Sequence, residues 1–318
     1  MGLYPAWRIG VPLAGPLCRG ILWLDKWPRS VERATTSEMR LHGHVFSVLT
    51  DLTAAAAACV ARLSAESVRS RGRFTVAFSG GSLPGLLCPG LVAQPLRGGI
   101  DWPAWRVFWA DERCVPATDA RSNYATLREH FLDHVGIAPQ QVYPMDATLA
   151  LDPAAAAAAY QAALASVFRP AAGEPPRFDL ILLGLGEDGH TASLFPSHSL
   201  LRETVRWVAP VFDSPKPPPR RITMTLPVLN NARDIVFMAA GAGKSEALAR
   251  VLGEDEGENT LAAQLVHPCD GRVTWFVDEQ AASRLRQSPA CADALTCRCS
   301  TARRFARGTG GFQAVAGR

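Results

Sequence analysis

The sequence predicts an α/β protein with a mostly parallel sheet and helices on both faces. Short apolar runs rich in valine, isoleucine and phenylalanine recur along the chain, and helix-prone segments separate them. Strands that are apolar on both sides are typical of parallel sheets covered by helices on both faces. The length of 318 residues and the hydrophobic fraction of 48% are sufficient for such a core.

The first half of the chain supplies two of these strands and three helices. The strands are expected at 74–78 (FTVAF) and 106–110 (RVFWA). The helices are expected at 52–68, 123–135 and 153–168. Gly136 stops the second helix, and Asp152 followed by Pro153 caps the third, since a short acceptor and then proline suit a helix start.

The second half continues the alternation. Four strands are expected, at 178–183, 222–226, 235–239 and 273–277. A helix is expected at 244–252, between the last two of them. Ligands of open α/β sheets bind beyond the carboxyl ends of the strands, so the chemistry should lie in the loops that follow these runs.

Composition excludes several classes of protein. The net charge of +4 comes from 33 basic and 29 acidic residues spread along the chain, which argues against a nucleic-acid partner. No run of 18 apolar residues occurs, so no membrane span is expected. The eight cysteines form no C-x-x-C pair and indicate reduced thiols in the cytoplasm. Cys297 and Cys299 form a lone C-x-C without the second pair that structural zinc requires, so no metal is expected.

Three regions follow from the distribution of these patterns: an N-terminal extension at 1–39, a catalytic domain at 40–287 and a C-terminal tail at 288–318. The extension has neither a helical nor a strand period. A targeting peptide is one interpretation, but Pro12 and Pro16 interrupt its apolar stretch, and an unstructured extension is favoured. The tail is poor in apolar residues and is also expected to be disordered. The oligomeric state is left open, with a monomer favoured.

The loop after the first strand reads Ser79-Gly80-Gly81-Ser82 and leads into a predicted helix. Consecutive glycines let backbone amides approach an anion, and a helix N-terminus adds its partial positive charge, so this loop suits a phosphate group. A structural turn would use glycines in the same way. The residues also lie close to a G-x-S-x-G nucleophile elbow, which leaves Ser82 as an alternative nucleophile, although Pro84 replaces the last glycine.

Charged residues follow two further strands. Asp111, Glu112 and Arg113 come directly after RVFWA, and we interpret them as a positioned cluster rather than a solvated run, since Arg can grip an anionic substrate. The segment GLGEDGH presents Asp188 and His190 beside three glycines. Histidine titrates near neutrality and can move a proton, so catalysis is favoured over a structural loop histidine.

Basic residues flank two further strands. Arg220 and Arg221 enter the strand at 222–226, and Lys244 follows Gly241-Ala242-Gly243. A complete nucleotide P-loop would need a glycine where Met238 stands, so a nucleotide site is not supported. A lysine that opens a helix beyond a glycine loop still suits a phosphate monoester.

Taken together, these motifs resemble the 6-phosphogluconolactonase family, over roughly residues 40–286. They are SGGS at 79–82, DER at 111–113, SNY at 122–124, GLGEDGHTASLFP at 184–196, SPKPPPRRITMTLPVLN at 214–230, GAGK at 241–244 and VTWFVDEQAA at 273–282. The resemblance implies a Rossmann-like α/β fold, related to that of the glucosamine-6-phosphate deaminases and isomerases. It also implies hydrolysis of 6-phospho-D-glucono-1,5-lactone, a small phosphosugar, without metal or cofactor in the oxidative pentose phosphate pathway.

The resemblance also implies roles for individual residues. His190 would be the general base with Asp188 beside it, while Asp111 would orient the site and Arg113 would contact substrate. The phosphate would be held by Lys244, by Arg221 rather than Arg220, and by the backbone of Ser79, Gly80, Gly81 and Ser82.

Two alternatives remain at this point: a serine hydrolase that uses Ser82, and a phosphosugar-binding regulator. The deaminase pattern expects an acid five residues beyond the histidine, where this chain has Phe195, which argues against amino-sugar chemistry. A phosphosugar-binding regulator could share the architecture without catalysis. Such a regulator needs a DNA-reading module, and the N-terminal extension has too few helix signals for one.

Overall fold

The computed structural model describes residues 41–253, 260–268 and 270–285. The chain divides into two units, 1–38 and 39–318, and every described residue belongs to the second unit. The predicted extension at 1–39, the predicted tail at 288–318 and the C-x-C cysteines therefore lie outside the described residues. The fold and its cavities are those of the second unit alone.

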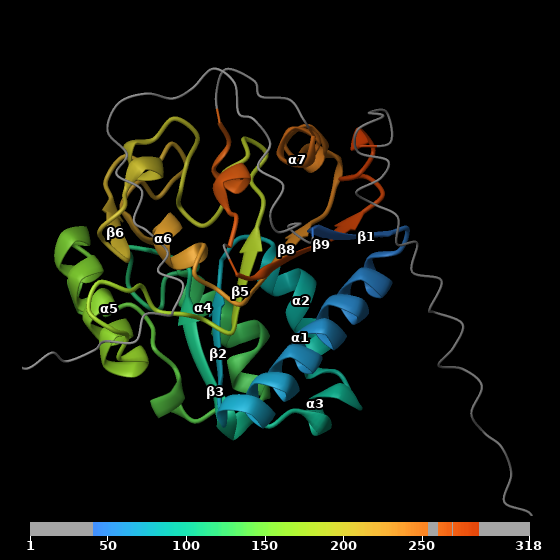
Figure 1. Cartoon of the computed structure of the whole chain (residues 1–318), viewed down its shortest axis with the longest axis horizontal. Helices are drawn as coiled ribbons and strands as arrows, with labels where there is room; N and C mark the ends of the chain where they lie inside the picture. The colour runs from blue at the N-terminus through green and yellow to red at the C-terminus, as the bar shows by residue number, and fades with distance from the viewer. Residues whose placement is uncertain (1–40, 254–259, 269, 286–318) are drawn as a thin grey trace, which may run out of the picture. The chain divides into compact units, whose positions relative to one another are not determined.

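A six-stranded sheet forms the centre of this unit, and all its neighbouring strands pair in parallel (Figure 1). In spatial order the strands are β1 (Leu41–Phe46), β9 (Arg272–Asp278), β8 (Asp234–Ala239), β5 (Leu180–Gly184), β2 (Phe74–Phe78) and β3 (Trp105–Trp109). The predicted α/β class with a mostly parallel sheet is confirmed.

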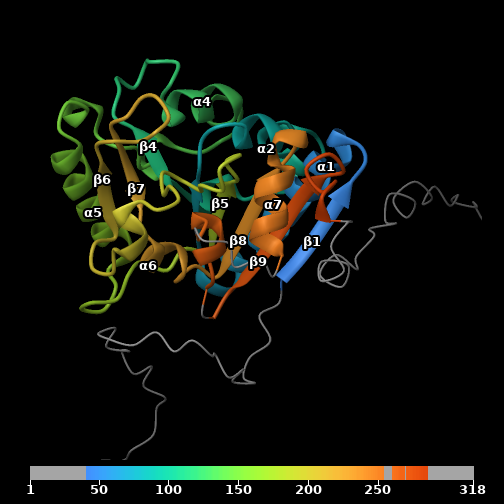
Figure 2. The same ribbon diagram turned by 90° about the horizontal axis from the view of Figure 1, so that it is seen from above.

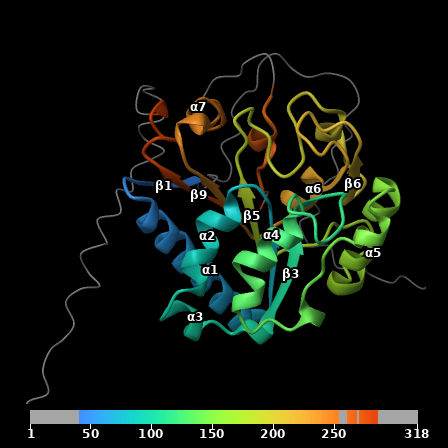
Figure 3. The ribbon, with the colours of Figure 1, turned by 180° about the vertical axis from the view of Figure 1, so that it is seen from behind.

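Each face of the sheet is covered by its own apolar cluster, because successive strand residues point to opposite sides. In β5, Leu180 and Leu182 join one cluster, and Ile181 and Leu183 join the other. The first cluster includes α1 (Leu49–Arg71), α2 (Leu83–Val92) and α4 (Asn123–His130). The second includes α5 (Pro153–Phe168), α6 (Leu226–Leu229) and α7 (Ser245–Leu252). Figure 2 shows the two layers on either side of the strands, and Figure 3 shows α1, α2 and α4 together with the short α3 (Leu96–Gly99).

A second, three-stranded sheet is antiparallel, with the order β4 (Asp111–Arg113), β7 (Arg221–Met224) and β6 (Val208–Val211). The apolar run expected at 222–226 as a strand of the parallel sheet belongs here, so that expectation was wrong. The backbone amide of Met224 donates to the carbonyl of Ala110 at 2.7 Å and joins the two sheets. Apolar content shows that a strand is buried but not which partner it pairs with.

Most predicted elements appear close to their expected bounds, and β2 and α5 match them fully. The Asp152 carboxylate accepts from the amides of Ala154 and Ala155, as a cap should. The helix expected at 123–135 ends early, at His130, because Phe131 leaves helical angles (φ −142°, ψ −61°) and its ring is buried. A 3₁₀ turn then covers the three residues after Phe131.

No helix in the described ranges is long and apolar enough to pass through a lipid bilayer.

Candidate active site

A cavity of about 170 Å³ opens at the carboxyl ends of β2, β5 and β8, beside the antiparallel sheet. Nine of the ten sequence-predicted site residues line it: Ser79, Gly80, Gly81, Ser82, Asp111, Arg113, His190, Arg221 and Lys244. The tenth, Asp188, contacts His190. Parallel strands bring their carboxyl ends to one edge, so loops that are more than a hundred residues apart in sequence meet in this cavity.

The His190 imidazole is held in place by Asp188. Its Nδ1 lies 2.5 Å from Oδ1 of that carboxylate, and its ring packs against Phe195 with 4.8 Å between centroids. Burial alone would raise the pKa of Asp188, but the hydrogen bond with His190 and the charges of His190 and Lys216 lower it well below its usual value. An ionised Asp188 favours the tautomer that carries hydrogen on Nδ1. The other nitrogen, Nε2, has no hydrogen-bond partner among the described residues and is available to a ligand.

A tight turn shapes the segment that carries this pair. The amide of Gly186 donates to the carbonyl of His190 at 2.8 Å, and Gly189 adopts a positive φ of 80°. A Cβ on Gly186 would lie only 1.9 Å from Nδ1 of His190. The glycine at 186 is therefore required by the close approach of the imidazole.

Lys216 lines the cavity and was not singled out from the sequence. Its Nζ lies 3.3 Å from Oδ1 of Asp188, so it shares that carboxylate with His190. The guanidinium of Arg221 donates to the carbonyls of Lys216, at 2.7 Å, and Pro218, at 3.0 Å, and so fixes the loop that carries this lysine. The sequence evidence for Lys216 was its position in the motif SPKPPPRR, in which we considered only the two arginines.

Asp111 is buried and ties three elements together. One carboxylate oxygen accepts from the hydroxyl of Ser79 at 2.9 Å, and the other accepts from the hydroxyl of Ser193 at 2.7 Å. Ser193 also accepts a hydrogen bond from Arg221 at 3.2 Å. Asp111 thus joins the SGGS turn to the loop that follows β5. Ser193, another residue not identified from the sequence, extends this network to β7.

The SNY motif supports the SGGS turn from behind. The Glu112 carboxylate accepts from the amides of Asn123 and Tyr124, each at 2.7 Å, and so satisfies the N-terminus of α4. Asn123 in turn donates to the Asp111 carbonyl at 2.8 Å. A Cβ on Gly80 would lie 1.9 Å from the amide oxygen of Asn123. The first glycine of the turn therefore makes room for Asn123.

Four cationic side chains line the cavity: those of Arg113, Lys216, Arg221 and Lys244. Arg113 and Arg221 are directly opposite each other on β4 and β7. Burial lowers the pKa of Arg221, the charge of Asp111 partly offsets this, and the nearby Arg113 lowers it further. The buried Nε of Arg113 has no partner among the described residues. Within the described ranges, the cations that line the cavity outnumber its one lining carboxylate, Asp111, and an excess of positive charge suits an anion.

Arg220 points away from this cavity. It donates to the carbonyl of Leu151 at 3.3 Å and is exposed, whereas Arg221 is buried and lines the cavity. Between the two neighbouring arginines, the geometry favours Arg221 as the one next to a ligand.

The GAGK loop is held by β9. Both carboxylate oxygens of Asp278, at the end of β9, accept from the amide of Gly241, at 3.0 and 2.9 Å. A Cβ on Gly243 would lie 2.7 Å from the Glu187 carboxylate, so this loop lies against the loop of His190. Lys244 is thereby set at the start of α7, on the rim shared with the imidazole.

The alternative of a serine nucleophile finds little support in the backbone. Ser82 has ordinary right-handed helical angles (φ −77°, ψ −13°), whereas a nucleophile elbow places its serine on a strained turn. Its side chain makes no hydrogen bond with any described residue. The amides at the start of α2, which follows directly, are not capped by the Ser82 side chain.

Comparison with known proteins gives a consistent family. The family model "Glucosamine-6-phosphate isomerases/6-phosphogluconolactonase" matches residues 48–275. The human 6-phosphogluconolactonase is 44% identical over 243 residues, which cover 76% of this chain and 92% of the human protein. A probable 6-phosphogluconolactonase of Schizosaccharomyces pombe is 43% identical over 249 residues, which cover 76% of this chain and 95% of that protein.

Solved structures agree with the sequence relatives. The 6-phosphogluconolactonase of Trypanosoma brucei superposes with a TM-score of 0.69 at 30% identity, covering 78% of this chain and all of that one. A monomeric glucosamine-6-phosphate deaminase superposes with a TM-score of 0.59 at 20% identity, covering 77% of this chain and all of that one. The second likeness concerns the fold alone, and it confirms the predicted relation to the deaminase fold.

Proposed function

The chain belongs to the glucosamine-6-phosphate isomerase/6-phosphogluconolactonase family, and on that premise we propose that it hydrolyses 6-phospho-D-glucono-1,5-lactone to 6-phosphogluconate. The observation that carries the proposal is the position of His190. Its imidazole, oriented by Asp188, lines one cavity together with Lys244 and the SGGS turn. A proton acceptor and an anion-binding surface in one cavity are what a phosphorylated ester substrate requires.

In this proposal His190 acts as the general base and then as the general acid. Nε2 takes a proton from water while the water oxygen bonds to the lactone carbonyl carbon. When the tetrahedral intermediate collapses, the bond between that carbon and the ring oxygen breaks, and the imidazolium returns the proton to the departing oxygen. General acid–base catalysis of this kind contributes ~10²–10⁴-fold. Asp188 holds the tautomer and balances the positive charge that develops on the ring.

The remaining residues bind and orient the substrate. We assign the phosphate to Lys244, Arg221 and the backbone amides of the turn formed by Ser79, Gly80, Gly81 and Ser82, because all of these groups line the cavity and can donate hydrogen bonds to an anion. We assign a direct substrate contact to Arg113, whose buried Nε has no partner among the described residues. Asp111 keeps the turn in place through Ser79 and is a positioning residue.

No metal is part of this mechanism. Within the described ranges no group of three or more His, Cys, Asp or Glu residues gathers as a cation would need. We place the reaction in the oxidative pentose phosphate pathway and in the cytoplasm. Support for the cytoplasm comes from the three described cysteines, Cys59, Cys88 and Cys114, all of which are free thiols.

The test is a coupled assay of the full-length protein on freshly prepared lactone, corrected for spontaneous ring opening. We expect 6-phosphogluconate to form in proportion to enzyme concentration, with and without a chelator. Binding of 6-phosphogluconate without turnover would replace the proposal with a phosphosugar-binding regulator. Stoichiometric labelling of Ser82 by a fluorophosphonate would replace it with a serine hydrolase.

A further inference from the structure

A second, larger cavity of about 520 Å³ lies at the opposite edge of the parallel sheet. Its lining residues come from the amino ends of the strands and the carboxyl end of α1: Asp179 precedes β5, Arg233 precedes β8, Arg272 begins β9 and Arg71 ends α1. Five arginines and four acidic residues line it, so its charge is mixed but positive overall. The lactone site does not include any of them.

The acidic residues of this cavity already have partners. Asp179 is buried, and its carboxylate accepts from the amide and hydroxyl of Thr75, each at 2.8 Å, and from Nε of Arg71 at 2.8 Å. Asp234 accepts two hydrogen bonds from Arg272, at 2.8 and 3.1 Å. A carboxylate with this many donors has little capacity left for a cation, which argues against a metal or an amine as the ligand.

The remaining two acids are also paired, and both pairs lie at the surface. The Glu66 carboxylate accepts from Arg62 at 2.8 Å, and the Asp270 carboxylate accepts from Nη2 of Arg177 at 2.9 Å. Asp270 is 89% exposed, so water screens its charge. The acids therefore neutralise the cavity's arginines only in part.

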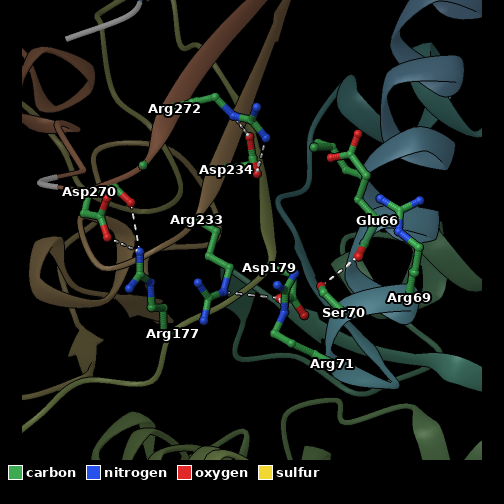
Figure 4. Close-up of a pocket in the computed structure, with 12 residues that line it drawn as sticks. Glu66, Arg69, Ser70, Arg71, Arg177, Asp179, Arg233, Asp234, Asp270 and Arg272 are labelled. Carbon is green, nitrogen blue, oxygen red and sulfur yellow. Dashed lines mark hydrogen bonds and ion pairs between the residues drawn. The ribbon is translucent and has the colours of Figure 1, made fainter. Parts of the chain in front are cut away.

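The arginines retain most of their donors. Arg71 uses only Nε, and Arg177 uses only Nη2. Arg233 approaches Asp179 at 3.6 Å, beyond hydrogen-bond distance. The Nε atoms of Arg177 and Arg233 are buried and have no hydrogen-bond partner in the described part of the chain. Figure 4 shows Arg233 between Arg177 and Asp179, with Arg71 reaching the same carboxylate from α1.

Like charges crowd this corner of the cavity. Burial lowers the pKa of Arg233, and the charges of Arg177 and Arg71 lower it further, whereas Asp179 and Asp270 act in the opposite direction. The position of Arg71 at the carboxyl end of α1 explains why a cation occurs there, since cations are favoured at helix carboxyl ends. This helix end does not account for Arg177 or Arg233, which belong to other segments. Arg71 and Arg233 thus lie at one fully bonded carboxylate, and Arg177 acts on Arg233 from the other side, which leaves a place for a further anion.

We propose that this cavity binds a small phosphorylated metabolite, with its phosphate held by Arg71, Arg177 and Arg233. Guanidinium groups bind phosphate oxygens through paired, charge-assisted hydrogen bonds, and each of these three has N–H groups to offer. A volume of about 520 Å³ is within the usual range for small-molecule sites and exceeds what a bare phosphate fills, so an organic portion of the ligand also fits. Arg69, also in the lining and without a partner among the described residues, supplies a further cation.

The experiment is an isothermal titration of the full-length protein with inorganic tripolyphosphate at near-physiological ionic strength. The variant is the double substitution Arg177→Gln and Arg233→Gln, and the matched control is Arg128→Gln, an exposed arginine of α4 paired with one acid. We expect the wild type and the control to bind one more tripolyphosphate per chain than the double variant. Binding at the lactone site is common to all three proteins and cancels from the comparison.

The double variant is expected to weaken this site at least ~10-fold, since two charge-assisted contacts are lost. Equal stoichiometry and affinity for tripolyphosphate in the wild type and the double variant would overturn the proposal. A loss of binding in the Arg128→Gln control as large as that in the double variant would also overturn it, because it would indicate binding to general surface charge. The single variant Arg233→Gln removes one of three crowded cations and should leave the unfolding midpoint unchanged or higher. A fall in that midpoint would identify Arg233 as a structural ion-pair residue instead. The titration does not depend on lactone hydrolysis, so the two proposals can fail separately.

Discussion

Substitution of Gly186 by alanine should disable the site without disturbing the fold. A Cβ at this position would lie 1.9 Å from Nδ1 of His190, 2.3 Å from its Cε1 and 2.5 Å from Oδ1 of Asp188. Ordinary van der Waals contact begins at 3.4 Å, so the imidazole must move by about 1.5 Å and the carboxylate by about 0.9 Å. The backbone itself accepts alanine, because Gly186 does not have a positive φ.

A displacement of about 1 Å at a catalytic group can cost ~10²-fold in rate. We therefore expect kcat to fall by at least ~10²-fold, which corresponds to ~3 kcal/mol of barrier. KM should change much less, because the phosphate contacts assigned to Lys244 and the SGGS turn are not touched. The coupled lactone assay, corrected for spontaneous opening, measures both constants.

The matched control is Gly136→Ala. Gly136 lies in an exposed loop, and a Cβ there meets nothing within 4 Å. Both variants should unfold at the wild-type temperature, and only Gly186→Ala should lose turnover. Wild-type kcat in a folded Gly186→Ala protein would refute the reasoning, because it would mean that the position of the imidazole does not matter.

Three further outcomes are expected. Asp188→Asn should lower kcat at least tenfold with little change in KM, since the amide no longer fixes the tautomer of His190 or balances its charge; kinetics over a range of pH measure this, and an unchanged kcat would contradict it. Lys244→Ala should reduce kcat/KM for the phosphorylated lactone ~10²-fold more than for glucono-1,5-lactone, and equal losses would remove this lysine from the phosphate site. Burial would raise the pKa of Glu203, but hydrogen bonds from the amides of Arg206 and Val205 and from the Arg206 guanidinium lower it to about 2. Glu203→Gln should therefore reduce the free energy of unfolding by about 1 kcal/mol at neutral pH, allowing for solvent screening of the half-exposed arginine. This difference should shrink as the pH falls below about 4.5. Urea unfolding at several pH values measures it, and a difference that does not depend on pH would contradict the prediction.

The sequence was informative where local chemistry determines structure. A β-branched or aromatic run followed by glycine is a local pattern, and it located β2 and the SGGS turn. The convergence of Ser79, His190 and Lys244 on one cavity was also predictable, because a parallel sheet carries all its post-strand loops to one edge. Only the fold class was needed to place these distant segments together.

Residues whose role depends on long-range contacts could not be found from such local patterns. Ser193 matters because its hydroxyl meets Asp111, and Asn123 matters because its amide fits over Gly80. Neither contact leaves a periodic trace in the sequence. Lys216 lies in a proline-rich segment that has no periodic pattern. Its closeness to Asp188 depends on the conformation of this loop, which Arg221 fixes by donating to backbone carbonyls.

The pairing of strands was the other feature that the sequence could not predict. The run at 222–226 is apolar enough for a central parallel strand, yet β7 pairs antiparallel with β4 and β6. A buried strand needs apolar side chains in either sheet, so composition cannot distinguish a parallel strand from an antiparallel one. The early end of α4 has a similar origin, because burial of the Phe131 ring overrides the helical spacing that continues beyond it.

The most direct measurement of the central claim is single-turnover hydrolysis of the phosphorylated lactone by His190→Asn, with binding of 6-phosphogluconate measured on the same preparation. Asparagine can still form hydrogen bonds but cannot accept a proton near neutral pH. The proposed mechanism predicts a ~10²–10⁴-fold slower chemical step with product affinity close to that of the wild type. A chemical step at the wild-type rate would show that another group activates the water.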